Sequence, residues 1–268
     1  MGCPREAVRL VRGDGDAEVR MVGTRSREDW TERMRSFSET RVKALEKMEL
    51  SGYVLKSKSP TCGLERVKVY SSKGMAEKCG RGLFAEALLK RLPWLPVEEE
   101  GRLNDAVLRE NFIERVFAYH RWQLFAADRF SVGRLVEFHR RHKFQILAHS
   151  DPHLRRLGRI VAGAKGKPKA EVLNAYAEAF FEGLAVKTTA RKHVNVLQHI
   201  LGFFREKIDA EDRKELLAAI ENYRLGLVPR IVPATLLLHH LRRSQIPYML
   251  DQYYLSPSPK ELVLKYHC

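Results

Sequence analysis

The spacing of apolar residues along the chain changes character near Asn104. Before this point, short apolar runs typical of strands alternate with stripes that repeat every three to four residues, as in helices. Ser26 or Thr24 is placed to cap the first of these helices. The alternation of strand and helix predicts an α/β sheet domain. Its strands are expected at Ala7–Val11, Glu18–Val22, Tyr53–Leu55, Val67–Tyr70 and near Pro96–Glu100, and its helices at Arg27–Met48 and Leu83–Leu92.

After Asn104 the strand patterns stop, and the apolar residues follow helical spacing. Asn104 is placed to cap a long helix that runs to about Arg129. Further helices are expected at 132–149, 152–163, 169–187, 189–207, 210–225 and 231–244, most of them separated by Gly, Pro, Asp or Ser. The sequence therefore predicts a partial α/β sheet domain at residues 1–128 and an all-α domain of about six helices at residues 129–268.

The chain is strongly basic, with a formal net charge of +15. Residues 131–268 carry 23 Lys and Arg side chains against 13 Asp and Glu side chains. This excess favours a polyanionic partner, nucleic acid before an anionic membrane surface, over a charge that serves solubility alone. The chain contains no run of about 18 apolar residues, so no membrane span is expected. The first four residues lack the features of a signal peptide, so a cytoplasmic protein is expected.

Cys62 follows an apolar strand candidate, in a loop that also contains Ser59. A thiol on such a loop becomes a thiolate more easily when backbone N–H groups and cations such as Lys56 or Lys58 lie nearby. The alternative is a small residue that packs under a turn. Ser59 likewise has two interpretations, a hydrogen-bonding group at a site or a side chain that caps its own turn.

The segment Ser59-Pro60-Thr61-Cys62-Gly63 resembles the S-P-x-C-G loop of the thiouracil desulfurase (TudS) family. The match continues in the same order through Gly82–Ala85, Leu95–Leu103 and Arg115–Trp122. The resemblance implies a [4Fe–4S] cluster held by three cysteines, with one iron open to the substrate sulfur. It makes Cys62 a cluster ligand and Ser59 a catalytic group that positions substrate or water.

The chain departs from this family pattern near its first residues. The resemblance places two further cluster cysteines and an acid/base glutamate upstream of the segment matched by Gly2–Ala7, and Arg5 stands where a glutamate would follow Cys3-Pro4. The domain is therefore expected to be truncated and its activity impaired. Cys79 matches no family ligand, Cys268 is the last residue and is expected to be frayed, and one thiolate does not hold a four-iron cluster.

Basic clusters recur across separate predicted helices of the second domain. Taken singly, each is a solvated helix face, but several on one folded surface would contact successive phosphates. The candidate RNA-binding residues are Arg140, Arg141, Lys143, Arg155, Arg156, Arg159, Arg191, Lys192, Arg242 and Arg243.

Nine of the ten histidines also lie in the second domain. His139 and His142 have a spacing that metal ligands can use on a helix, but no H-E-x-x-H motif or carboxylate pair accompanies them. Histidines that lie among arginines on a polar or RNA-facing surface are the preferred interpretation.

The second domain resembles a YbgA domain over nearly its whole length. The resemblance rests on Phe138–Lys143, Ala148–Ser150, Leu157–Arg159, Asn195–His199, Tyr223-Arg224, Val232–Leu237, His239–Arg242 and Gln252–Leu255. Proteins that join the two domains are similar to the tRNA 4-thiouridine desulfidases (RudS), in which the helical domain is thought to hold tRNA. The resemblance thus implies an enzyme of tRNA modification that removes sulfur from 4-thiouridine. The alternatives are a non-catalytic nucleic-acid-binding protein and a desulfurase for free thiouracil.

Overall fold

The structure, a computed structural model, describes residues 6–13, 18–204 and 207–259. The chain divides into two compact units, Met1–Tyr119 and His120–Cys268, called here the sheet unit and the helical unit. The division falls inside the long helix α3 (Ala106–Ala127), whereas the sequence places the boundary just after this helix. Among the residues described, no helix combines the length and apolarity needed to cross a membrane.

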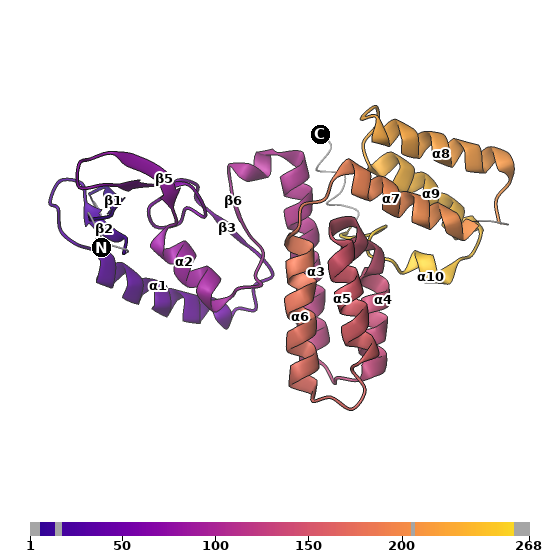
Figure 1. Ribbon diagram of the computed structural model, residues 1–268, viewed down its shortest axis with the longest axis horizontal. Helices are drawn as coiled ribbons and strands as arrows, with labels where there is room; N and C mark the ends of the chain where they lie inside the picture. Colours follow the sequence, from indigo (N-terminus) through magenta and orange to yellow (C-terminus); the bar gives the residue numbers. More distant parts are fainter. Residues whose placement is uncertain (1–5, 14–17, 205–206, 260–268) are drawn as a thin grey trace. The chain divides into compact units, whose positions relative to one another are not determined.

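The sheet unit contains a mixed sheet with the strand order β2-β1-β4-β5 and a separate parallel pair, β3 and β6 (Figure 1). In the sheet, β1 pairs antiparallel with β2 and parallel with β4, and β4 pairs antiparallel with β5. The elements are β1 (Val8–Val11), β2 (Arg20–Gly23), α1 (Thr31–Glu46), β3 (Tyr53–Leu55), β4 (Val67–Tyr70), β5 (Ala76–Gly80), α2 (Leu83–Arg91), β6 (Val97–Glu99) and the short η1 (Arg102–Asn104). The predicted α/β class is confirmed.

One face of the mixed sheet carries the core of this unit. Leu10 and Val69 are adjacent across β1 and β4, and both are buried with the α2 residue Leu88. Because side chains alternate along a strand, Arg9 and Lys68 belong to the opposite face. The core therefore leaves a second sheet face on which polar and charged residues gather.

Two helix starts differ from the expectation. The side chain of Asp29, and not that of Ser26 or Thr24, accepts the Thr31 N–H at the start of α1. Asp105, and not Asn104, accepts the N–H groups of Val107 and Leu108 at the start of α3. The Asp29 bond closes the turn just before α1, whose N-cap residue is Trp30, whereas Asp105 caps α3.

The helical unit follows the predicted pattern closely. Its elements are α4 (Val132–His149), α5 (Asp151–Ala162), α6 (Lys169–Ala185), α7 (Ala190–Leu201), η2 (Gly202–Phe204), α8 (Ala210–Arg224), α9 (Ile231–Arg243) and α10 (Pro247–Leu250). The six longer helices match the six predicted ones, and the four-residue α10 brings this region to about seven. Side chains of Ser131, Thr189 and Asp209 cap α4, α7 and α8, which accounts for their well-predicted starts.

Two groups of buried residues hold the helical unit together. Trp122, at the end of α3, stacks on Tyr176 of α6 with 5.6 Å between ring centroids, and further aromatic rings surround them. The second group contains Leu197, Phe204 and Leu241 from α7, η2 and α9. Both groups consist mainly of apolar and aromatic side chains, and their burial stabilises the unit.

Candidate active site around Cys62

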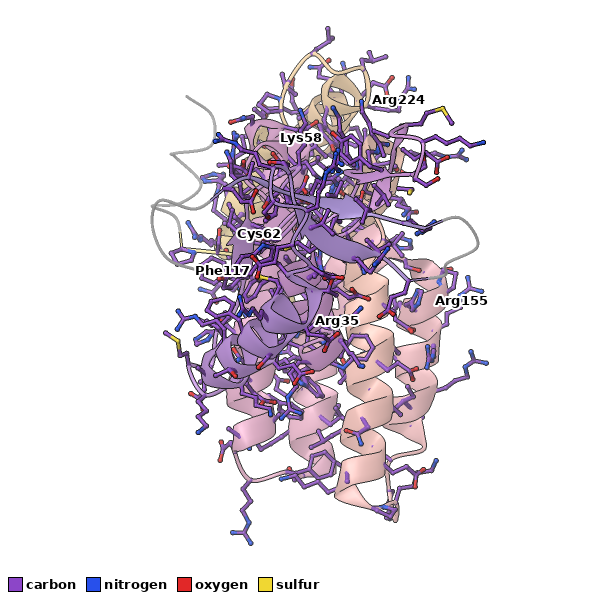
Figure 2. The ribbon with its side chains drawn as sticks, turned by 90° about the vertical axis from the view of Figure 1, so that its left-hand side faces the viewer. Arg35, Lys58, Cys62, Phe117, Arg155 and Arg224 are labelled. Carbon is purple, nitrogen blue, oxygen red and sulfur yellow. The ribbon has the colours of Figure 1, made fainter. Side chains whose placement is uncertain are left out.

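Cys62 lies in the connection between β3 and β4 (Figure 2). Residues 56–64 of this connection are called the Cys62 loop. Carbonyls of the loop accept hydrogen bonds from the first N–H groups of α2, which have no partners within the helix itself. Gly82 donates to Gly63 at 2.8 Å, Leu83 to Pro60 at 3.3 Å, and Phe84 and Ala85 to Thr61 at 2.9 and 3.4 Å. The loop is therefore fixed on the N-terminus of α2.

Two glycines permit this close packing. A Cβ atom on Gly82 would lie 2.3 Å from the Thr61 carbonyl group and 2.6 Å from the Cys62 nitrogen. A Cβ atom on Gly63 would lie 2.3 Å from Val67 Cγ2 and 2.8 Å from the Ser59 carbonyl oxygen. Side chains at these positions would force the loop and α2 apart.

Ser59 stabilises the turn that carries Cys62. Its Oγ accepts the N–H groups of Thr61 and Cys62, both at 3.2 Å, and its carbonyl accepts the Gly63 N–H at 2.8 Å. This is the turn-capping role that the sequence offers as one interpretation. A role toward a substrate stays a prediction.

Two successive carboxylates at the end of β6 hold both ends of the Cys62 loop. Glu99, which is buried, accepts the Leu64 N–H at 2.7 Å. Glu100 accepts the Ser57 N–H at 2.7 Å and pairs with Lys56 at 2.9 Å. The Lys56 ammonium group, with the Ser57 N–H, lowers the pKa of Glu100 to about 2. Glu100 is thus the ion-pair partner of Lys56, one of the two lysines that the sequence offers as cations near the thiol.

The Cys62 side chain is half-buried and packs against the core of the sheet unit. Its position thus combines the two predicted possibilities, a thiol on a loop and a small residue packed under a turn. The loop follows β3 and the two carboxylates end β6, so both lie at the carboxyl ends of parallel strands. This is the edge at which α/β sheets commonly bind ligands.

The residues described do not fit a [4Fe–4S] cluster. Cys79 lies exposed on β5, with its Sγ 3.9 Å from a Glu77 carboxylate oxygen. Cys3 and Cys268, like Arg5, lie outside the described residues. No group of three or more His, Cys, Asp or Glu side chains in the described ranges is placed to hold a metal ion. Cys62 is therefore one cysteine where the resemblance expects three.

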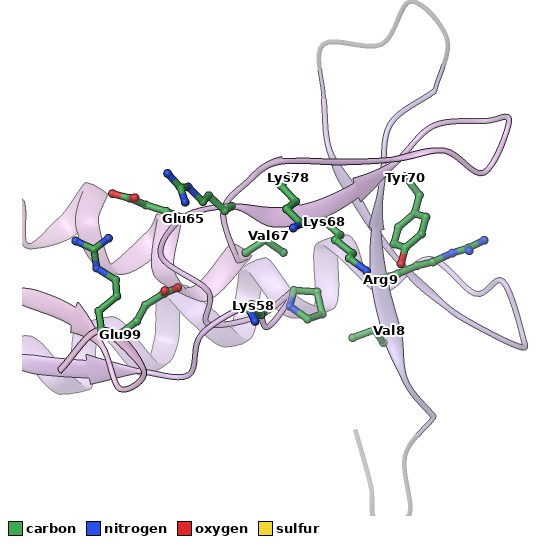
Figure 3. A pocket seen from close by; sticks show the side chains of 12 residues that line it. Val8, Arg9, Lys58, Glu65, Val67, Lys68, Tyr70, Lys78 and Glu99 are labelled. Carbon is green, nitrogen blue, oxygen red and sulfur yellow. The ribbon is translucent and has the colours of Figure 1, made fainter. Parts of the chain in front are cut away.

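A cleft of about 570 Å³ opens beside the Cys62 loop (Figure 3). Lys58 and Pro60 of the loop line it, as do residues of β1, β4, β5 and the segment after β6. Six cations and two carboxylates, Glu65 and Glu99, contribute to the lining. The cations are Arg9, Lys58, Arg66, Lys68, Lys78 and Arg102. Sequence reasoning missed this cleft, although the outward position of Lys68 in the strand pattern at 67–70 was a signal for part of it.

The ten candidate RNA-binding residues fall into two groups. Half of them make contacts within the helical unit. Arg140 binds Glu137, Asp251 and the Tyr248 carbonyl; Arg141 lies over the Tyr253 ring; Arg155 pairs with Asp151, Arg156 with Glu178 and Glu182; and Lys192 binds the carbonyls of His149 and Lys187. The other half, Lys143, Arg159, Arg191, Arg242 and Arg243, are exposed and form no ion pair among the residues described.

Several histidines of the helical unit are buried, contrary to the predicted polar surface. His142 and His149 are fully buried, and His193 and His240 nearly so. His142 bonds the Phe138 carbonyl through Nδ1 at 2.8 Å, and its ring packs on Phe138. Burial lowers the pKa of His139 to about 4 and that of His142 well below its ordinary value. His139 and His142 are therefore neutral packing groups, because the low-polarity surroundings disfavour the imidazolium.

Comparison with known proteins assigns the two parts of the chain to different families. Residues 143–259 match a family described as "Protein of unknown function (DUF1722)", and residues 1–100 match the 2-thiouracil desulfurase family. A relative, the "Uncharacterized protein YbgA" of Escherichia coli (strain K12), is 31% identical over 153 residues, which is 57% of this chain and 90% of that protein.

The chain belongs to the YbgA family. This YbgA-family chain also carries a 2-thiouracil desulfurase domain, and that domain contains the Cys62 loop, α2 and the carboxylates of β6. No solved structure matches the chain. The resemblance stated from the sequence is thereby confirmed for both domains.

Proposed function

We propose that this YbgA-family chain acts on thiolated uracil within RNA, with 4-thiouridine in tRNA as the substrate. The sheet unit presents Cys62 to the sulfur-bearing base, and the helical unit binds RNA phosphates through its exposed cations. The observation that carries the proposal is the Cys62 loop. It lies within the desulfurase domain, is fixed on the N-terminus of α2 and is tied to Glu99 and Glu100.

The reaction inferred is a hydrolysis without net oxidation or reduction. Water supplies the oxygen that replaces sulfur at the base, the carbon–sulfur bond breaks, and the sulfur leaves with two protons as hydrogen sulfide. The sulfur of a cysteine is a soft group suited to sulfur chemistry or to a soft metal. The buried carboxylate of Glu99 lines the cleft next to the Cys62 loop and fixes the loop through Leu64.

The resemblance adds a [4Fe–4S] cluster, which would bind the substrate sulfur at an open iron. The described residues supply Cys62 alone, so we assign no step to the cluster. We expect this 268-residue chain to assemble little of it and to release sulfide slowly or not at all. The exposed cations of the helical unit that form no ion pair among the residues described favour a second candidate function, non-catalytic binding of RNA.

A sulfide-release assay separates these possibilities. The chain, expressed without oxygen, is incubated with 4-thiouridine tRNA and, separately, with free thiouracil, and iron, acid-labile sulfide and product sulfide are measured per chain. Sulfide released from the tRNA, and lost in the Cys62→Ser variant, supports the enzyme. Binding of tRNA with neither iron nor sulfide release supports the non-catalytic function. Turnover of the free base without affinity for tRNA would refute the proposal.

A further inference from the structure

The cleft beside the Cys62 loop holds more positive charge than its own carboxylates balance. Glu99 is occupied with the Leu64 N–H, and Arg102 pairs with Glu98 at 2.7 Å. Four exposed cations, Lys58, Arg66, Lys68 and Lys78, form no ion pair among the residues described, and the only other carboxylate in the lining is Glu65. Such an uncompensated group of cations is a binding feature for anions.

Two of these lysines face each other directly across the sheet. Lys68 of β4 and Lys78 of β5 are register partners in the antiparallel pair, just after an irregularity between Val67 and Lys68. Like charges directly opposite each other destabilise a strand pair. An anion bound between the two ammonium groups would remove this repulsion, so the lysine pair is more stable with an anion bound.

Arg9 supplies a third reason to expect a ligand. Its guanidinium lies 5.1 Å from the centre of the Tyr70 ring, and its Nε is buried without a hydrogen-bond partner among the residues described. Buried donors normally have a partner, so an unmatched one beside a cleft indicates a place for an acceptor atom. Figure 3 shows Arg9, Lys68 and Tyr70 close together at this part of the cleft.

We propose that this cleft binds the phosphodiester backbone of the RNA strand whose thiolated base reaches the Cys62 loop. The inference rests on the proposed function and adds a phosphate-binding site within the sheet unit, separate from the basic residues of the helical unit. A free thiouracil is neutral and gives these cations nothing to pair with, whereas successive phosphates match cations contributed by a loop and by neighbouring strands. Lys58 joins the two parts of the site, because it belongs to the Cys62 loop and lines the cleft.

The test compares two triple variants of the full chain with equal loss of charge. The cleft variant is Lys58→Ser, Lys68→Thr and Lys78→Thr. The control is Arg41→Ala, Lys43→Ala and Lys47→Ala, three exposed cations on or beside α1 in the same unit that line no part of the cleft. Binding to unmodified tRNA and to 4-thiouridine tRNA is measured over a range of salt concentrations.

We expect the cleft variant to bind both tRNAs more weakly and to reduce the slope of log affinity against log salt by about two to three, since each phosphate contact contributes about 0.7–0.9. The control should change the slope by less than one. The thermal unfolding temperature of the cleft variant should be at least as high as that of the wild type, because the repulsion between Lys68 and Lys78 is relieved. This stability measurement excludes misfolding as the cause of weaker binding.

The outcomes separate the two proposals. Equal slopes for cleft variant and control would overturn the phosphate site, even if the wild type releases sulfide from tRNA. A reduced slope in the cleft variant, with no sulfide release from any substrate, supports the site and removes the catalytic part of the proposed function. If the wild type binds no tRNA, or if the cleft variant instead loses binding to vesicles containing phosphatidylserine, the phosphate site is overturned.

Discussion

Replacement of Gly82 by alanine tests whether α2 fixes the Cys62 loop. Gly82 has φ −68° and ψ 143°, which alanine adopts without strain, so the effect comes from the new methyl group alone. That group would lie 2.3 Å from the Thr61 carbonyl carbon and oxygen, and both are backbone atoms that cannot rotate away. Overpacking of this kind costs about 1–3 kcal/mol. We expect the loop and the first turn of α2 to separate.

The assay is hydrogen exchange of the α2 amides that bond the loop. If the free energy needed to separate the loop from the first turn of α2 falls by about 1–3 kcal/mol, the exchange rate at residues 82–85 should rise roughly 5- to 140-fold, at tenfold per 1.4 kcal/mol. Alkylation of Cys62, followed by mass spectrometry, should also become faster.

Gly101→Ala is the matched control for this experiment. A Cβ atom on Gly101 meets only Ser57 Oγ, at an ordinary contact distance of 3.7 Å. Exchange and alkylation in this variant should resemble the wild type. The reasoning is refuted if Gly82→Ala leaves both the α2 amides and the reactivity of Cys62 unchanged.

Three further predictions concern single side chains. Glu99→Ala should lower the free energy of unfolding by about 1–3 kcal/mol and speed exchange of the Leu64 amide, because that N–H loses its acceptor. Glu99→Gln keeps an acceptor oxygen and should lower it less. Equal effects of the two changes would show that the bond is unimportant. The pKa of Glu100 is lowered to about 2, so the ionised carboxylate stabilises the fold fully above about pH 4.5 and loses this effect as the pH falls toward 2. A carboxyl NMR titration should show this, and Lys56→Met should raise the midpoint. The pKa of His139 is lowered to about 4, so burial of the neutral ring favours folding above about pH 6.5 and this contribution is lost as the pH falls toward 4. Unfolding of the His139→Gln variant should depend less on pH in that range, and an unchanged dependence would contradict the assignment.

The helical unit was the more predictable part of the fold. Its helices carry regular apolar stripes, and residues such as Ser131 and Asp209 mark their starts by capping the first turn. In the sheet unit, β5 was missed because Ala76–Gly80 is polar and exposed, so it has no buried face to create an alternating pattern.

The site residues were less predictable than the elements because their partners are distant in sequence. Arg140 meets Asp251 through α10, an element that the pattern does not reveal, and Arg156 meets Glu178 on another helix. A basic cluster in the sequence therefore does not distinguish an ion-paired arginine from an exposed one. The cleft was invisible for the same reason, since Arg9 and Lys78 become neighbours of the Cys62 loop only through the order of the strands.

The central claim is that the thiolated base of an RNA reaches the Cys62 loop, and photo-crosslinking tests it most directly. A 4-thiouridine tRNA bound to the full chain is irradiated with near-ultraviolet light, and the crosslinked peptide is identified by mass spectrometry after trypsin digestion. We predict a crosslink on the peptide that runs from Ser59 to Arg66, absent when the tRNA lacks sulfur. Crosslinks confined to the helical unit, with none on this peptide, would contradict the account.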